Sequence, residues 1–345
     1  MPGTRHSALA SVTRKTGVWH RRTLKAHPRQ RAAAELVLLA IFLGLLTWGV
    51  RGSFHSAGKD LGSANIGWFV LACVAVAAYY LVFVIGWMRI LADWGVHISY
   101  PTSLNAEIVS MLAKYVPGGV WTPAARVVAM RRAGVNDAAL VTAAMLVEAG
   151  LSAVAGVLVF AISLVWVHGV NGPVIPIGVF GIVIALLLYP RVFHSLAARF
   201  LRRLGYSELP PLRASTVGGL LVFYAGTWII GGTGLWLLLR SVGAHPSVPT
   251  VVFLGGTSAV GAIVAVLAFF TPSGLGAREG SMYGLMLAVT TSGAALSATI
   301  LNRVAITIVE LLLFLAGWLV LRRVERRGSR GSSPVSAAVE PAPRR

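Results

Sequence analysis

Residues 138–167 read AALVTAAMLVEAGLSAVAGVLVFAISLVWV, an apolar run that contains one charge, Glu148. A helix needs about 20 apolar residues to cross the hydrocarbon core of a bilayer, so this run is long enough to span it. No segment shows the ten-residue alternation of a membrane strand, so helices rather than a β-barrel are predicted. Comparable apolar runs, each predicted to be a helix, cover residues 36–50, 66–88, 173–189, 214–239, 248–270 and 294–321.

The composition agrees with this interpretation. Hydrophobic residues make up 56% of the chain and charged residues 12%, and the mean hydropathy of +0.77 excludes a soluble globular domain. We therefore predict an all-α, polytopic membrane helical bundle with about six to eight spans at residues 35–321. The basic leader, residues 1–34, and the basic tail, residues 322–345, are predicted to be disordered.

The net charge of +19 is concentrated between the apolar runs, in residues 1–34, 191–213 and 322–345. The positive-inside rule places these three segments in the cytoplasm, so we expect a multi-pass inner-membrane protein with both termini inside. Topology accounts for the basic residues, and no nucleic-acid partner is expected. We also expect a signal anchor at residues 36–50 rather than a cleaved signal peptide.

Few residues suggest covalent or metal chemistry. The chain has a single cysteine, Cys73, so an intramolecular disulfide is excluded. This cysteine lies within an apolar run. The eight histidines lack metal-ligand spacing, so neither a metal site nor a cofactor is predicted. Because the sequence shows no pairing of a nucleophile with a base, we do not expect an enzyme.

Two segments share a pattern that indicates an internal repeat. Residues 115–126 read YVPGGVWTPAAR and residues 270–279 read FTPSGLGARE. Pro117 precedes Glu148 by 31 residues, and Pro272 precedes Arg303 by the same number, so both pairs have an offset of 155. The repeat halves are predicted at about residues 66–190 and 214–321.

Each Pro-Gly segment is predicted to be the tip of a helical hairpin. The first hairpin would comprise residues 103–116 and 124–133, and the second residues 248–270 and 281–291. Three spans separate the equivalent elements, and an odd number inverts their orientation, which gives an inverted repeat like those of many transporters. The alternative is that the second hairpin crosses the membrane fully.

Ionisable groups inside the membrane are the first site candidates, because each costs roughly 2.5–3.5 kcal/mol at the helix centre. Glu148 lies about ten residues into its predicted helix. Arg303 and Glu310 stand seven residues apart and therefore on one face of the last helix. These groups are expected to handle a substrate or an ion; the alternative is that Glu148 pairs with Arg303 or Arg278 to hold helices together.

The Pro-Gly tips are the second candidates. A broken helix exposes unpaired N–H groups that attract anions, and a nearby guanidinium strengthens the binding of a phosphate. The alternative is an ordinary turn between helices. The tip residues and their neighbouring charges are Pro117, Gly118, Gly119, Arg126, Pro272, Gly274, Gly276, Arg278 and Glu279.

Over about residues 36–321 the chain resembles the lysylphosphatidylglycerol synthase transmembrane family, a flippase-like membrane region that also occurs alone. The resemblance implies a lipid-translocating region without the synthetase domain, which transfers an amino acid from tRNA to phosphatidylglycerol in full-length members. It rests on Lys114-Tyr-Val-Pro117-Gly118-Gly119, Arg126, Gly134, Glu148, Pro272-Ser-Gly274-Leu-Gly276-Ala-Arg278-Glu279 and Arg303.

From these features we expect a transporter or flippase of a phospholipid, glycolipid or polyprenyl-linked lipid. Arg126, Arg278 and Arg303 would face phosphate, while the acids balance their charge. One alternative is an accessory subunit with a glycosyltransferase or lipid-modifying enzyme as its partner. Another is a membrane-embedded lipid enzyme.

Overall fold

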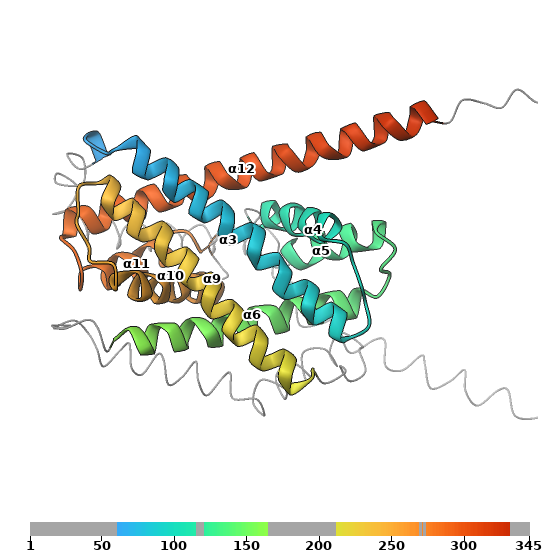
Figure 1. The fold of residues 1–345 in the computed structure, drawn as a ribbon, viewed down its shortest axis with the longest axis horizontal. Coiled ribbons are helices and arrows are strands. Elements are labelled where there is room, and N and C mark those ends of the chain that lie inside the picture. The colour runs from blue at the N-terminus through green and yellow to red at the C-terminus, as the bar shows by residue number, and fades with distance from the viewer. Residues whose placement is uncertain (1–60, 115–120, 165–211, 269–270, 272–273, 332–345) are drawn as a thin grey trace, which may run out of the picture. The chain divides into compact units, whose positions relative to one another are not determined.

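The computed structural model describes residues 61–114, 121–164, 212–268, 271 and 274–331 (Figure 1). Every regular element in these ranges is a helix, which confirms the predicted all-α class. The predicted spans at residues 36–50 and 173–189 lie outside the described residues. The helices are α3 (Ile66–Asp93), α4 (Tyr100–Ala113), α5 (Trp121–Arg132), α6 (Ala138–Ser163), α9 (Ala214–Ser241), α10 (Thr250–Leu267), α11 (Ala277–Met286) and α12 (Ser292–Gly331).

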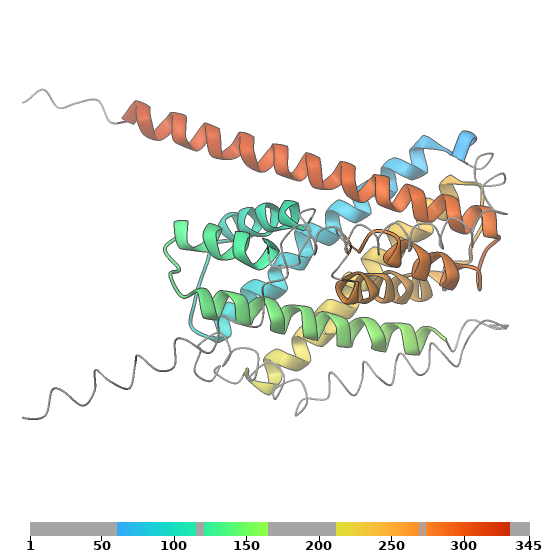
Figure 2. The same ribbon diagram turned by 180° about the vertical axis from the view of Figure 1, so that it is seen from behind.

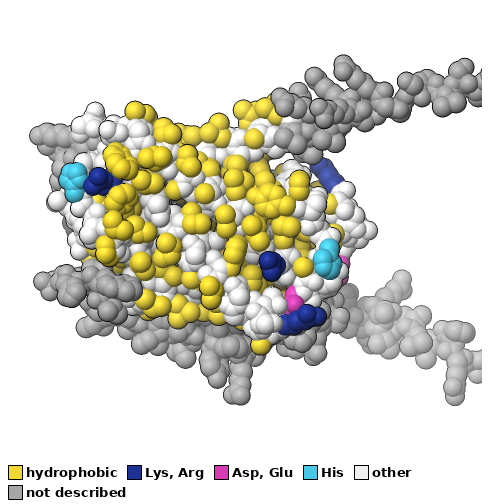
Figure 3. Space-filling view, viewed as in Figure 1, with side chains coloured by type: hydrophobic (Ala, Val, Ile, Leu, Met, Phe, Trp, Pro, Cys, Tyr) yellow, Lys and Arg dark blue, Asp and Glu magenta, His cyan; other side chains and the backbone are white. Residues whose placement is uncertain are grey.

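Within the described ranges, five helices are long and apolar enough to cross a membrane: α3, α6, α9, α10 and Ser292–Gly317 of α12. Large apolar side chains point outward from them; Ile66, Val222 and Val266 are 72%, 76% and 73% exposed. Figure 3 shows a broad hydrophobic band between two ends at which Lys and Arg side chains lie. Such a surface is stable in lipid rather than in water, as expected for a polytopic membrane protein.

Local signals set where the long helices begin and end. The Asn65 side chain accepts hydrogen bonds from two N–H groups in the first turn of α3, at 2.9 and 3.3 Å. Asp137 caps α6 in the same way, at 3.0 Å from the N–H of Leu140. Gly95 and Gly243 follow α3 and α9, each with φ 80°, a conformation that favours glycine and ends the helix.

The helix boundaries follow the predicted repeat. Shifting α5 by 155 residues gives 276–287, against the observed Ala277–Met286 of α11. The same shift takes α6 to 293–318, which begins one residue after the start of α12. It takes α4 to 255–268, which overlaps most of α10. The two halves therefore share one order of a short helical hairpin followed by a long helix.

The equivalent helices α3 and α9 lie side by side and run in opposite directions. At one end the N–H of Asn65 donates to the carbonyl of Ser241 at 2.8 Å, and at the other the N–H of Arg213 donates to the Asp93 carboxylate at 2.9 Å. In Figures 1 and 2, α6 and α12 also run in opposite directions, and the two hairpins lie at opposite ends of α3. The repeat is therefore inverted.

Each hairpin begins and ends on one side of the bundle. Leu254 near the start of α10 and Met286 at the end of α11 share a core cluster with Leu239 at the end of α9. In the other half, Met130 near the end of α5 shares a cluster with Leu91 at the end of α3. A hairpin that crosses fully would also begin and end on one side, but the 10 residues of α11 are too few to cross a hydrocarbon core about 30 Å thick, which favours the re-entrant interpretation.

Glycines bring α9 and α10 into backbone contact. A Cβ added at Gly232 would lie 2.3 Å from a carbonyl oxygen of α10, and one added at Gly255 would lie 2.7 Å from a carbonyl oxygen of α9. Neither position can take a side chain unless the helices separate. The close packing fixes the second hairpin against the bundle.

Candidate functional site

Arg126 on α5 is buried between two carboxylates. Its Nη1 lies 2.9 Å from Oε2 of Glu148 on α6, and its Nη2 pairs with Glu107 on α4. Its Nε donates to Oγ of Ser110 at 3.2 Å, and its guanidinium lies 4.8 Å from the ring centroid of Trp87. The two acids and Arg126 are each no more than 5% exposed. We call Glu107, Arg126 and Glu148 the acidic cluster, because its formal charges sum to −1.

This geometry differs from the alternative in which Glu148 pairs with Arg303 or Arg278. The first hairpin packs against α6 and places Arg126 beside the Glu148 carboxylate. In the described residues this carboxylate therefore pairs with α5 rather than with a cation of α11 or α12. Arg126 is thus compensated by protein groups. The predicted phosphate role therefore has less support at Arg126 than at Arg278.

Glu310 on α12 joins the second half of the protein to the first. Its Oε1 pairs with Nζ of Lys114, which follows α4, and it accepts a hydrogen bond from the hydroxyl of Tyr80 on α3. Tyr80 is absent from the predicted site, because a tyrosine in an apolar run gives no signal of its own.

Glu279 connects the start of α11 to α12. One carboxylate oxygen accepts a hydrogen bond from the N–H of Gly276 at 2.6 Å, and the other lies 3.6 Å from Nη1 of Arg303. Gly276, with φ 84°, and Gly274, with φ 67°, form the buried turn that leads into this helix. The second Pro-Gly segment is therefore a turn at which a carboxylate, rather than an external anion, occupies the helix start.

Arg278 differs from the other charged residues of this region. Among the described residues, its buried Nε has no hydrogen-bond partner and its guanidinium forms no ion pair. Arg278 lies close enough to Lys114, Tyr79 and Tyr80 to interact with them electrostatically. The surrounding formal charges sum to +1, and we call this group the basic cluster: Lys114, Arg278, Glu279, Arg303 and Glu310.

Tyr79 on α3 interacts electrostatically with both Glu148 of the acidic cluster and Arg278 of the basic cluster. Each cluster contains side chains from a helical hairpin and from a long helix. Pro117, Gly118, Gly119 and Pro272 lie outside the described residues. Within the described ranges, no three His, Cys, Asp or Glu side chains gather as metal ligands.

The profile of the family described as Lysylphosphatidylglycerol synthase TM region matches residues 34–313. The chain belongs to this family. The match covers both halves of the repeat and every charged residue of the two clusters, and so places them in the lysylphosphatidylglycerol synthase TM region. A comparison with curated proteins finds no match.

Proposed function

We propose that this integral membrane protein moves a lipid with a phosphate-containing headgroup across the bilayer, and that Arg278 binds the phosphate. The observation that carries the proposal is the charge of the basic cluster. Lys114 and Arg303 each have a carboxylate partner, whereas Arg278 has no such partner in the described part of the chain. Arg278 is half-buried and its Nε is shielded from solvent without a hydrogen-bond partner, so an anionic ligand that accepts from this group would stabilise it.

The chemistry of Arg278 favours phosphate. A guanidinium presents a planar fork of N–H donors that matches two phosphate oxygens, and in a low-dielectric environment such charge-assisted bonds are strong. Lys114 and Arg303 would add to the positive potential without leaving their own partners. The substrate classes are those expected from the sequence: a phospholipid, a glycolipid or a polyprenyl-linked lipid.

The inverted repeat supports transport rather than static binding. Inverted repeats with hairpins that enter from opposite sides are a common transporter architecture, in which a central site opens alternately to each side. The accessory-subunit alternative and the membrane-enzyme alternative require no such symmetry. The family match agrees with a lipid-related membrane role.

The test is a transfer assay in liposomes that contain the full chain and a trace of fluorescently labelled phosphatidylglycerol. Dithionite added outside quenches the label in the outer leaflet, and the later loss of signal reports transfer. We expect transfer above that of protein-free liposomes for the wild type. Arg278→Gln should reduce the rate at least tenfold, and Arg278→Lys should retain part of it, because the charge remains while the planar fork is lost.

Arg131→Gln is the matched control, because Arg131 is an exposed arginine at the end of α5. It should transfer lipid at the wild-type rate. A wild-type rate in Arg278→Gln would exclude Arg278 as the phosphate ligand. A wild-type protein that transfers no lipid but co-purifies with a glycosyltransferase would favour the accessory-subunit alternative.

A further inference from the structure

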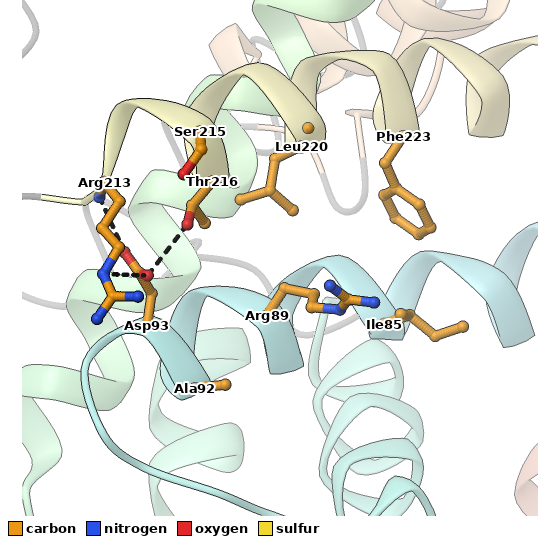
Figure 4. Close-up of a pocket in the computed structure, with 10 residues that line it drawn as sticks. Ile85, Arg89, Ala92, Asp93, Arg213, Ser215, Thr216, Leu220 and Phe223 are labelled. Atoms are coloured by element: carbon orange, nitrogen blue, oxygen red, sulfur yellow. Dashed lines mark hydrogen bonds and ion pairs between the residues drawn. The ribbon is translucent and has the colours of Figure 1, made fainter.

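A cavity of about 620 Å³ lies between the end of α3 and the start of α9, in a region that neither cluster uses. Figure 4 shows its side chains, with α9 above and α3 below. The volume is within the roughly 300–1,000 Å³ typical of small-molecule sites. The residues that carry the argument are Ile85, Arg89, Arg213, Gly219, Leu220 and Phe223.

Asp93 fixes the shape of this cavity. Its carboxylate accepts hydrogen bonds from the N–H of Arg213 at 2.9 Å and from the hydroxyl of Thr216 at 3.0 Å. Its side chain is only 8% exposed. The carboxylate therefore holds the start of α9 against α3 and is occupied by protein donors, so it does not repel an anion strongly from the cavity mouth.

Two arginines give the mouth a positive charge. Arg213 lies 3.7 Å from Asp93, but its side chain is 81% exposed and can reach a ligand. Arg89 is exposed and, among the described residues, makes no ion pair or hydrogen bond. With Asp93 counted, the formal charge is +1. In Figure 4, Arg89 extends along the gap between the two helices.

The polarity changes with depth along both helices. Ile85 lies one turn before Arg89 on α3, and Leu220 and Phe223 lie one and two turns after Thr216 on α9. Both steps lead from the charged helix ends toward the membrane interior. Gly219 also lines the cavity and, because it has no side chain, leaves space between α3 and α9.

A charged mouth above an apolar wall matches the chemistry of one molecule that is abundant at this depth. We propose that the α3–α9 cavity binds an anionic phospholipid from the adjacent leaflet, the side expected to be cytoplasmic. Arg89 and Arg213 hold the phosphate, and the first part of an acyl chain lies against Ile85, Leu220 and Phe223. This site is separate from the basic cluster, and the proposal does not depend on the transport activity.

Native mass spectrometry of the full chain in detergent tests this site. The protein is mixed with either phosphatidylglycerol or phosphatidylcholine, and bound lipids are counted as the collision energy rises. We expect the wild type to retain one phosphatidylglycerol at energies that remove phosphatidylcholine. The double variant Arg89→Gln, Arg213→Gln should lose that molecule, whereas Arg132→Gln, an exposed charge on α5, should retain it.

A second pair of variants tests the apolar wall without changing any charge. Gly219→Leu fills the cavity, and Gly218→Leu places the same side chain next to it. An added Cβ meets nothing within 4 Å at either position, so both variants should fold. Gly219→Leu should reduce the retained phosphatidylglycerol at least fivefold, and Gly218→Leu should not.

Each contrary result overturns the proposal in its own way. Retention of phosphatidylglycerol by the double arginine variant would show that the arginines do not hold the lipid. Loss in the arginine variant together with full retention in Gly219→Leu would identify a surface anion site rather than a lipid cavity. Equal retention of both lipids by the wild type would remove the role of charge.

Discussion

Removal of Arg126 should destabilise the protein strongly. In Arg126→Gln the carboxylates of Glu107 and Glu148, each 5% exposed, lose their common cation. At the observed 2.9 Å, an ion pair in an effective dielectric constant of about 20 has a Coulomb energy of about 6 kcal/mol, part of which offsets the cost of burial. Breaking such a pair by removing one partner costs about 3–5 kcal/mol.

The competing estimate is much smaller, because hydrogen bonds between membrane helices average only about 0.6 kcal/mol. Titration with SDS in mixed micelles, monitored by tryptophan fluorescence, measures the free energy of unfolding. The measured loss decides between the two estimates. The double variant Arg126→Gln, Glu148→Gln should recover part of the loss, because one fewer carboxylate is left buried. Arg213→Gln, which removes a 3.7 Å contact made by an arginine whose side chain is 81% exposed, should change the free energy by less than about 1 kcal/mol. A loss below about 1 kcal/mol in Arg126→Gln would refute the reasoning.

Two further predictions concern packing and topology. Gly232→Ala should lower the free energy of unfolding by about 1–3 kcal/mol, because its Cβ would meet the α10 backbone, whereas Gly218→Ala on the same helix should not lower it; SDS titration measures both. In a Cys73→Ser background, single cysteines at Ser56 and Ser329 should react with a membrane-impermeant thiol reagent from opposite sides. Reaction of both from the same side would contradict the predicted topology.

The sequence predicted the architecture well because local signals determine it. Apolar length defines the spans, Pro and Gly mark the hairpin turns, and one offset relates the halves. The first of these signals fails for short helices: α5 begins at Trp121 rather than at residue 124, and α11 begins at Ala277 rather than at 281. In both cases the helix begins closer to the tip than predicted.

The ion pairs were harder to predict, since they depend on how helices rotate against one another. Arg126 and Glu148 are 22 residues apart on consecutive helices, and their proximity was within reach of an argument from the hairpin. Lys114 and Glu310 are 196 residues apart. Nothing in either segment specifies the other, and only the packed bundle brings them together.

The inverted repeat separates charges that hold the structure from charges that remain for a ligand. Glu148 and Arg303 occupy equivalent positions with opposite sign, and each pairs with the short helix of its own hairpin, through Arg126 and Glu279. The offset does not superimpose the two partners, because Ser281 matches Arg126 and Ala124 matches Glu279, so each half builds the same kind of contact from different positions. Arg278 takes part in neither contact. It is the cation of the second hairpin that no described carboxylate neutralises, so a structural role explains it least.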